Sequence, residues 1–223
     1  MNIKKITILG HCNISLGIIL DSLYSVYQSA IEISIISNLE KNQNRYIDVP
    51  FLHQSIKTVE LHADEWQPNN DEHYVLSGMS PAIKKTIFEY FDSRYAIKHA
   101  NFISVIHASA VITNGVEISG FVNISPLSVV AQYAKIGNFV SINRNSSVGH
   151  HTQIDEFTSI NPGCNIGGGC KIGKNVVIGI GATVFDEITI GDNAIIGGGA
   201  VVTKDVKANT LVFGSPAKFI RTV

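Results

Sequence analysis

The chain has 223 residues, of which 45% are apolar and only 16% charged, and its formal net charge at pH 7 is −1. This near-neutral balance lacks the basic excess that is typical of nucleic-acid-binding proteins, so we expect no nucleic acid partner. No apolar run approaches the roughly 20 residues that a membrane-spanning helix needs, so we expect no membrane segment either.

The first hundred residues alternate between strand and helix patterns. Apolar runs predict strands over residues 3–9, 31–36 and 73–76. Helical spacing predicts one helix over 16–27 and a second that begins near Pro81 and continues through Phe91. Such alternation is typical of a small α/β domain with a parallel sheet, which we expect to span residues 1–104.

The remainder of the chain follows a six-residue repeat. From Ile106 to Val202, an Ile or Val stands at every sixth position, 17 times in succession, and a small or β-branched residue follows each one four positions later. This period suits a short strand followed by a corner that tolerates positive φ. Three such segments close a triangular coil of eighteen residues, and coils stack about 4.8 Å apart. The repeat predicts an all-β parallel β-helix over 105–208, followed by a closing tail over 209–223.

Cysteine usage points to a reducing compartment. The three cysteines, Cys12, Cys164 and Cys170, form no CxxC pair and are odd in number. Reduced thiols of this kind favour a cytoplasmic location over a disulfide framework.

Three segments of the coil region carry a resemblance to a known family. They are residues 143–157 (NRNSSVGHHTQIDEF), the glycine-rich 166–169, and 201–218, which ends in GSPAK. The chain resembles the sialic-acid-synthesis and bacillosamine-type sugar acyltransferases of the hexapeptide-repeat superfamily. This resemblance implies a Rossmann-like N-terminal domain followed by a left-handed β-helix, although the general rule for parallel crossovers would favour the right-handed form.

The same resemblance implies an activity and an assembly. It implies a cytoplasmic homotrimer that transfers an acetyl group from acetyl-CoA to the amine of a nucleotide-linked amino sugar, for surface glycan biosynthesis. Acetyl-CoA would lie in the groove between two neighbouring prisms. Two alternatives stay open: O-acetylation of a sugar hydroxyl, and a catalytically silent β-helix that serves as a scaffold.

The family motif implies that His150 is the general base. A neutral imidazole suits this work near pH 7, although a lone histidine at a corner could equally be a solvated turn residue. The family carries Glu or Asp at the next position, where this chain has His151, which could fix the tautomer of His150 but offers no charge stabilisation. Asp155, Glu156 or a neighbouring subunit could supply the acid. His107 and the adjacent pair do not match the ligand spacing of zinc-binding β-helix enzymes, so we expect no metal.

Cofactor contacts are expected at several small residues. Counting eighteen from His150 places Gly168 one coil further, where its backbone N–H could stabilise a thioester carbonyl oxygen, although a corner glycine needs no such role. The resemblance implies that Gly198 and, more weakly, Ala182 line the path of the pantetheine arm. It also implies that Pro216 and Lys218, in the terminal GSPAK, close over coenzyme A.

Acceptor contacts are expected in both halves of the chain. Asn143 resembles a side-chain amide that contacts the sugar. In the N-terminal domain the family has a glycine-rich turn after the first strand, of which only Gly10 remains, and an acidic pair after the second strand, which is replaced by Ser-Asn38-Leu-Glu. Gly10 and Asn38 are therefore candidate substrate contacts, and packing alone would also account for Gly10.

Overall fold

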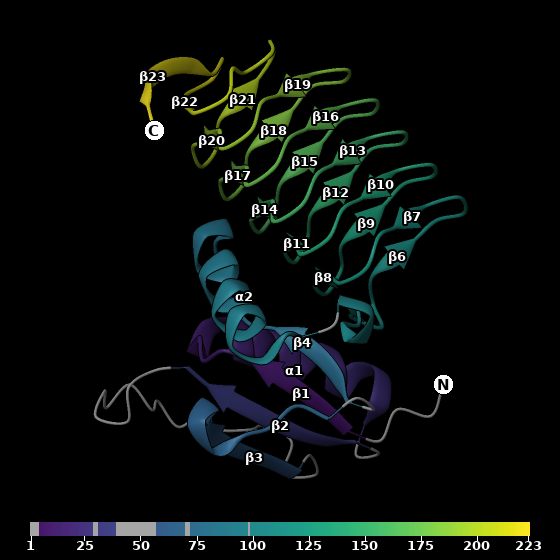
Figure 1. Cartoon of the computed structure of the whole chain (residues 1–223). Helices are drawn as coiled ribbons and strands as arrows, with labels where there is room; N and C mark the ends of the chain where they lie inside the picture. The colour runs from purple at the N-terminus through teal and green to yellow at the C-terminus, as the bar shows by residue number, and fades with distance from the viewer. Residues whose placement is uncertain (1–4, 29–30, 39–56, 70–71, 98) are drawn as a thin grey trace. The chain divides into compact units, whose positions relative to one another are not determined.

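The computed structural model describes residues 5–28, 31–38, 57–69, 72–97 and 99–223 (Figure 1). The chain divides into two compact units, Met1–Val105 and Ile106–Val223, each of which is described by itself. Two predicted features fall outside the described residues: the first two positions of the strand expected over 3–9, and Leu39 and Glu40 of the segment after the second strand.

In its described part, the N-terminal unit is a parallel sheet of four strands in the order β3-β2-β1-β4. The predicted strands and helices are confirmed, and β3 is an addition. Its two apolar residues, Val59 and Leu61, alternate with polar residues and give no continuous apolar run, and Val59 at this sheet edge is 54% exposed. The elements are β1 (Lys5–Leu9), α1 (Asn13–Tyr27), β2 (Glu32–Ser37), β3 (Lys57–His62), the 3-10 helix η1 (Ala63–Glu65), β4 (His73–Leu76), α2 (Pro81–Tyr95) and the 3-10 helix η2 (His99–Asn101).

Helix α2 begins where the sequence places a cap and a proline. The Ser80 hydroxyl accepts a hydrogen bond from the Ile83 N–H at 3.3 Å, and Pro81 occupies the first turn, where its missing N–H is not needed. The helix turns Ile87 and Phe91 into the core, together with the stem and amine of Lys84, which is only 1% exposed. A buried amine is uncommon and affects the stability of this unit.

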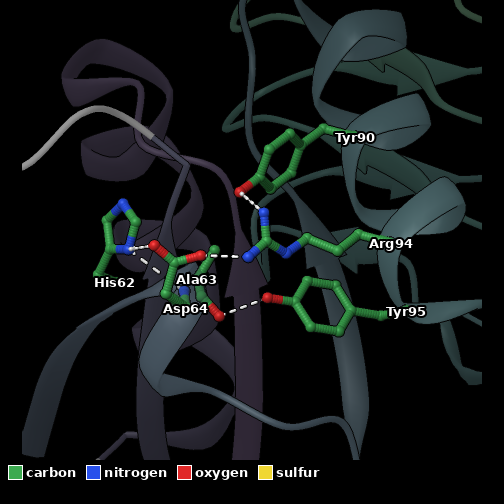
Figure 2. A network of polar contacts seen from close by, with 6 residues as sticks. All are labelled: His62, Ala63, Asp64, Tyr90, Arg94 and Tyr95. Atoms are coloured by element: carbon green, nitrogen blue, oxygen red, sulfur yellow. Dashed lines mark hydrogen bonds and ion pairs between the residues drawn. The ribbon is translucent and has the colours of Figure 1, made fainter.

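A polar network joins the end of α2 to η1 (Figure 2). The Arg94 guanidinium forms an ion pair with Asp64, and the Tyr95 hydroxyl donates to the carbonyl of Ala63. The His62 ring accepts the N–H of Asp64 at 3.2 Å, which caps η1. Because Arg94 and Asp64 are about half exposed, we expect this pair to contribute little to stability, as surface ion pairs generally do.

Residues 106–223, all described, form a prism of stacked coils with three parallel sheets as its faces (Figure 1). One sheet contains β6 (Val111–Ile112), β9 (Val129–Val130), β12 (Ser147–Val148), β15 (Asn165–Ile166), β18 (Thr183–Val184) and β21 (Val201–Val202). The second contains β7 (Glu117–Ile118), β10 (Lys135–Ile136), β13 (Gln153–Ile154), β16 (Lys171–Ile172) and β19 (Thr189–Ile190). The third contains β5 (Val105–Ile106), β8 (Val122–Ile124), β11 (Val140–Ile142), β14 (Ser159–Ile160), β17 (Val177–Ile178), β20 (Ile195–Ile196), β22 (Thr210–Phe213) and the antiparallel β23 (Lys218–Thr222).

The strand register confirms the predicted coil of eighteen residues. Ser147 pairs with Asn165, which in turn pairs with Thr183, so residues eighteen positions apart lie over one another. Only the last turn is shorter, since Ile195 pairs with Leu211. The Ile/Val ladder fills the interior of the prism, together with the small residues four positions later. The parallel sheets and the hexad core are consistent with the left-handed β-helix that the family resemblance implies.

Each coil turns at three corners, which we name by their residues in the coil that carries His150: 143–146, 149–152 and 155–158. From Leu127 to Gly199 one residue at each corner adopts positive φ, and in the coil that carries His150 these are Asn145, His151 and Phe157. The backbone conformation therefore repeats along the prism while the side chains at the corners vary. Any chemistry specific to one coil must come from those side chains.

Among the described residues, no helix combines the length and the apolar character that crossing a bilayer requires.

Candidate active site

His150 lies on the 149–152 corner, between β12 and β13, with its side chain exposed. Its carbonyl accepts the N–H of Gly169 at 2.8 Å, which ties the corner to the next coil. The imidazole is thus held at the surface by a backbone that is fixed on both sides. An exposed ring on a rigid support is a suitable arrangement for a group that exchanges protons with a substrate.

The predicted stacking of Gly168 on His150 is confirmed. A Cβ atom placed on Gly168 would lie 2.7 Å from both Cε1 and Nε2 of His150, so the ring occupies the space that any other residue would fill. Gly168 is buried, with the His150 ring against it. The glycine therefore sets the position of the imidazole.

The oxyanion role predicted for Gly168 is wrong in this structure. Its N–H donates to Oδ1 of Asp186 at 2.6 Å, so it is not free to bind a thioester carbonyl oxygen. Asp186 stands one coil beyond Gly168 in the same column, and its carboxylate reaches back to the amide. The sequence count that found Gly168 would have found Asp186 if it had been continued by one more coil.

The rings of His150 and His151 meet through their Nδ1 atoms, which lie 3.1 Å apart. The two ring planes are nearly perpendicular, at 84°. Asp155 and Glu156, the acids considered from the sequence, belong to the 155–158 corner, where Glu156 instead accepts a hydrogen bond from Lys174 at 2.8 Å. Among the described residues of this chain, the polar partner of the His150 side chain is therefore a second imidazole and not a carboxylate.

The residues predicted to contact sugar and pantetheine lie on a different corner from His150. Asn143 and Gly198 belong to the 143–146 corner and its column, separated from His150 by the strand position of β12. Asn143 Oδ1 accepts the N–H of Arg144 at 2.8 Å. Gly198 is partly exposed. The chain by itself does not bring these two residues to His150.

The structure corrects the cofactor contact expected at Ala182. It is 0% exposed, its methyl group lies in the prism core, and its N–H donates to the carbonyl of Gly179 at 3.1 Å. No part of it can touch a cofactor at the surface. It occupies the column of small residues that the repeat itself places inside, and that pattern outweighs the resemblance at this position.

Pro216 and Lys218 are exposed on the tail that follows the last coils. The Ala217 N–H between them donates to the carbonyl of Val201 at 2.7 Å, which anchors the tail to β21. A cavity of about 420 Å³ lies beside this tail and is lined by Val202, Lys204, Val206 and Val212, among others. Lys204 is three coils beyond His150, so this cavity is not part of the 149–152 corner.

In the N-terminal unit, Gly10 and Asn38 follow the carboxyl ends of the neighbouring strands β1 and β2, so both lie at one edge of the sheet. Gly10 is buried, its N–H donates to the carbonyl of Ile36 at 2.9 Å, and a Cβ atom there would lie 2.6 Å from Ile87. Packing therefore accounts for Gly10, and its amide is already paired within the sheet. Asn38 is partly exposed.

The turn after β1 also carries a contact that disfavours phosphate. His11 Nδ1 lies 2.7 Å from Oε1 of Glu60 on β3, so a carboxylate lies beside this turn. A carboxylate there would repel an anionic phosphate group.

Sequence reasoning missed three features of the coil unit. Tyr133 lies one coil before His151, with the ring centroids 5.1 Å apart. Gly163, Gly181 and Gly199 form a column of bare corners beside Gly198, which we call the glycine column. Asp186 is the third. Counting by eighteen from His151 and Gly168 would have found Tyr133 and Asp186, whereas the glycine column begins one position beyond the column of Gly198.

In the residues that the structure describes, no group of three or more His, Cys, Asp or Glu side chains is arranged to hold a metal ion.

One known family matches part of the coil unit. Residues 169–204 match the model of a family described as bacterial transferase hexapeptide (six repeats). Residues 169–204 are thus similar to the hexapeptide repeat of bacterial transferases, and they lie in the coils directly beyond His150. No curated protein sequence matches the chain.

Solved structures share the fold over nearly the whole chain. A variant of perosamine N-acetyltransferase from Caulobacter crescentus, in complex with CoA and GDP-perosamine, is 19% identical, with 98% of this chain and 97% of that chain covered and a TM-score of 0.74. The acetyltransferase domain of PglB from Neisseria gonorrhoeae, in complex with acetyl coenzyme A, is 19% identical, with 98% and 100% covered and a TM-score of 0.79. WeeI from Acinetobacter baumannii is 20% identical, with 97% and 100% covered and a TM-score of 0.75. At these identities the likeness establishes the fold.

Proposed function

We propose that the chain is an acetyl-CoA-dependent N-acetyltransferase that acts on the amine of a nucleotide-linked amino sugar in surface glycan biosynthesis. The observation that carries the proposal is the exposed His150 ring, set across the bare Gly168 in a prism of hexapeptide coils. The fold shared with acetyltransferases that bind CoA or acetyl coenzyme A supports it.

In this proposal the coil unit is a left-handed β-helix and the N-terminal unit is a Rossmann-like domain that holds the acceptor. The strand order β3-β2-β1-β4 supports the second assignment, because doubly wound α/β folds begin with that order. Residues 1–104 would receive the sugar nucleotide, 105–208 would carry catalysis and 209–223 would close over the cofactor. Among the predicted acceptor contacts of the N-terminal unit, Asn38 keeps this role, and packing accounts for Gly10.

The proposed active site is shared between subunits of a homotrimer. Within one chain, His150 and the pair Asn143 and Gly198 lie on different corners of the prism. A groove between two neighbouring prisms would place the 149–152 corner of one against the 143–146 corner of the other. The separation of the predicted residues within one chain supports this arrangement.

The chemistry centres on Nε2 of His150. Bound acetyl-CoA would supply a thioester, an activated acyl group with a thiolate leaving group. The acceptor amine attacks the acyl carbon, the C–N bond forms and the C–S bond breaks. Nε2 takes the proton that the amine loses, and can return it to the departing sulfur. A positioned general base typically contributes 10²–10⁴-fold to the rate.

Several groups of this chain fit coenzyme A. A Cβ atom on Gly181 or Gly199 would meet nothing within 4 Å, so the glycine column presents bare backbone along which an extended pantetheine arm can lie. Lys218 on the tail supplies an exposed cation for an anionic ligand. The proposal assigns no oxyanion donor to Gly168, because Asp186 already accepts its N–H.

A cytoplasmic location is part of the proposal. Cys12, Cys164 and Cys170 are free thiols, and burial raises the pKa of the Cys164 and Cys170 thiols, which keeps them unreactive. Free structural thiols support a reducing compartment.

The test incubates the chain with acetyl-CoA and a panel of nucleotide-linked amino sugars and neutral sugars, and follows release of the CoA thiol. We expect release with an amino sugar, and a loss of roughly 10²–10⁴-fold in His150→Ala. Gln153→Ala is the matched control, since Gln153 is exposed three residues further along the same coil. Unchanged activity in His150→Ala would contradict the assignment of the base.

Two other outcomes would favour the alternative functions. Release only with neutral sugars would indicate O-acetylation. Absence of CoA binding in calorimetry would indicate a scaffold.

A further inference from the structure

Tyr133 lies between a bare glycine and the ring of His151. A Cβ atom on Gly115 would lie 2.7 Å from both Cδ1 and Cε1 of Tyr133, so the missing side chain leaves room for the tyrosine ring. On its other side, the tyrosine ring lies 5.1 Å from the His151 ring, centroid to centroid, at an angle of 39°. Tyr133 and His151 occupy equivalent positions in successive coils, with φ of +61° and +59°. The tyrosine ring is therefore placed to restrict how the His151 ring can rotate.

The contact between His151 and His150 constrains the proton on His150. With the two Nδ1 atoms 3.1 Å apart, one must carry a hydrogen and the other must accept it. If His150 donates, its Nε2 keeps a free lone pair and can act as a base. If His151 donates, Nε2 of His150 carries the hydrogen and cannot accept a proton.

The backbone beside Nε2 of His150 favours the first arrangement. Nε2 lies against Gly168, whose N–H donates to Asp186 and whose carbonyl accepts the N–H of Glu187 at 2.8 Å. Both polar groups of the glycine are thus already paired, so neither offers a partner to a hydrogen on Nε2. A hydrogen on Nδ1 gains His151 as its acceptor.

We propose that Tyr133 and His151 are positioning residues for His150: the Tyr133 ring holds the His151 ring, whose Nδ1 accepts the Nδ1–H of His150 and leaves Nε2 free. The inference rests on the proposed role of His150 as general base. It gives a neutral imidazole the orienting task that the family resemblance gives to a carboxylate. Tyr133 acts through its ring, since its hydroxyl makes no hydrogen bond to a described residue, and it is 57% exposed.

The choice of variants separates the ring contact from the hydrogen bond. His151→Asn retains an acceptor near the position of Nδ1, whereas His151→Phe retains a ring and removes the acceptor. Tyr133→Phe retains the ring, whereas Tyr133→Leu removes it. Thermal unfolding of all four variants checks that the prism stays folded, which we expect because both residues are exposed.

The first measurement is the tautomer of His150 by two-bond ¹H–¹⁵N NMR on the full chain, with the His150 signals identified by their loss in His150→Gln. We expect hydrogen on Nδ1 in the wild type, in His151→Asn and in Tyr133→Phe. In His151→Phe and Tyr133→Leu we expect a shift of the population toward hydrogen on Nε2. An unchanged tautomer in His151→Phe, or hydrogen on Nε2 in the wild type, would overturn the proposal.

The second measurement is acetyl transfer. We expect kcat to fall about tenfold in His151→Phe and Tyr133→Leu, which is less than the loss expected on removing the base itself, with KM for acetyl-CoA unchanged. The conservative variants should recover most of that loss. Because the NMR measurement needs no substrate, it decides the positioning role even if the chain transfers no acetyl group.

Discussion

Gly10 and Gly168 were both predicted from the sequence as ligand contacts, and the structure gives them different tasks. At Gly10 the missing side chain makes room for Ile87 of helix α2, in the core of the N-terminal unit. At Gly168 the missing side chain makes room for the exposed His150 ring. The same residue type thus serves packing in one unit and the placement of a candidate base in the other.

The difference teaches that a glycine must be judged by its neighbour. Motif resemblance identifies both positions, but the neighbour of Gly10 is a buried aliphatic side chain and the neighbour of Gly168 is a titratable ring at the surface. Substitutions at the first should therefore change the free energy of unfolding, and substitutions at the second should change the rate. The N-terminal unit contains the single tryptophan, Trp66, which is buried, so its fluorescence reports on that unit alone.

The largest effect is expected from Lys84, also in the core of the N-terminal unit. Burial lowers the pKa of its amine from 10.5 to about 7. Between those values the unfolded chain binds more protons than the folded chain, so the free energy of unfolding should rise with pH from about 7 to 10.5. The rise should be on the order of 4 kcal/mol. Below pH 7 the penalty is fully present.

The comparison of wild type with Lys84→Met isolates this contribution. Denaturant unfolding followed by Trp66 fluorescence at pH 7 and pH 10 should give a rise in the wild type that is largely lost in Lys84→Met. An equal rise in both proteins would show that other groups titrate in this range and that Lys84 does not.

Gly10→Ala should destabilise the N-terminal unit by about 3 kcal/mol, from overpacking of about 1–3 kcal/mol and backbone strain of about 1–2 kcal/mol. Its φ is +91°, and the added Cβ would lie 2.6 Å from Ile87. Gly17→Ala is the matched control, because Gly17 lies within α1 and a Cβ there meets nothing within 4 Å. That control should stabilise the unit by roughly 0.5–1 kcal/mol. If Gly10→Ala proves as stable as the wild type, Ile87 does not need the space.

Gly168→Ala should reduce kcat by about 10²-fold, because a displaced catalytic group loses its alignment with the substrate. The added Cβ would push against the His150 ring, which is exposed and can move, so the free energy of unfolding should change by less than about 1 kcal/mol. In a His150→Gln background the same substitution should have no further effect on kcat. A loss that persists in that background would mean that Gly168 acts independently of His150.

In the coil unit, the sequence predicts the backbone register better than it predicts the contacts of individual side chains. The hexad period fixes which residue lies over which, since every coil repeats the same backbone, and so the stack of His150 on Gly168 could be counted. The pairing of the Gly168 amide with Asp186 could not, because it depends on the rotamer of a side chain one coil away. The Nδ1–Nδ1 contact of His150 and His151 depends on two ring rotamers in the same way.

In the N-terminal unit the sequence predicts less about how residues stack, because the contacts come from residues far apart in the sequence. The turn after β1 contacts Ile87 of α2 and Glu60 of β3, and no local sequence pattern predicts either contact. Ala182, in contrast, could have been placed from the sequence. Its inward position follows from the repeat, which predicts a core residue there more reliably than the family resemblance predicts a cofactor contact.

The smallest effect tests the glycine column and separates donor binding from base placement. Gly199 has φ of +66°, and a Cβ there would meet nothing within 4 Å, so Gly199→Ala adds a methyl group to an open surface. Backbone strain should destabilise the coil unit by about 1–2 kcal/mol. If the pantetheine arm lies along this column, the methyl group obstructs it and KM for acetyl-CoA should rise about fivefold, equal to roughly 1 kcal/mol, while kcat stays unchanged. Gly168→Ala should give the converse result, with kcat lowered and KM retained. If Gly199→Ala instead lowers kcat and leaves KM unchanged, the two glycines share one task, and the pantetheine path does not follow this column.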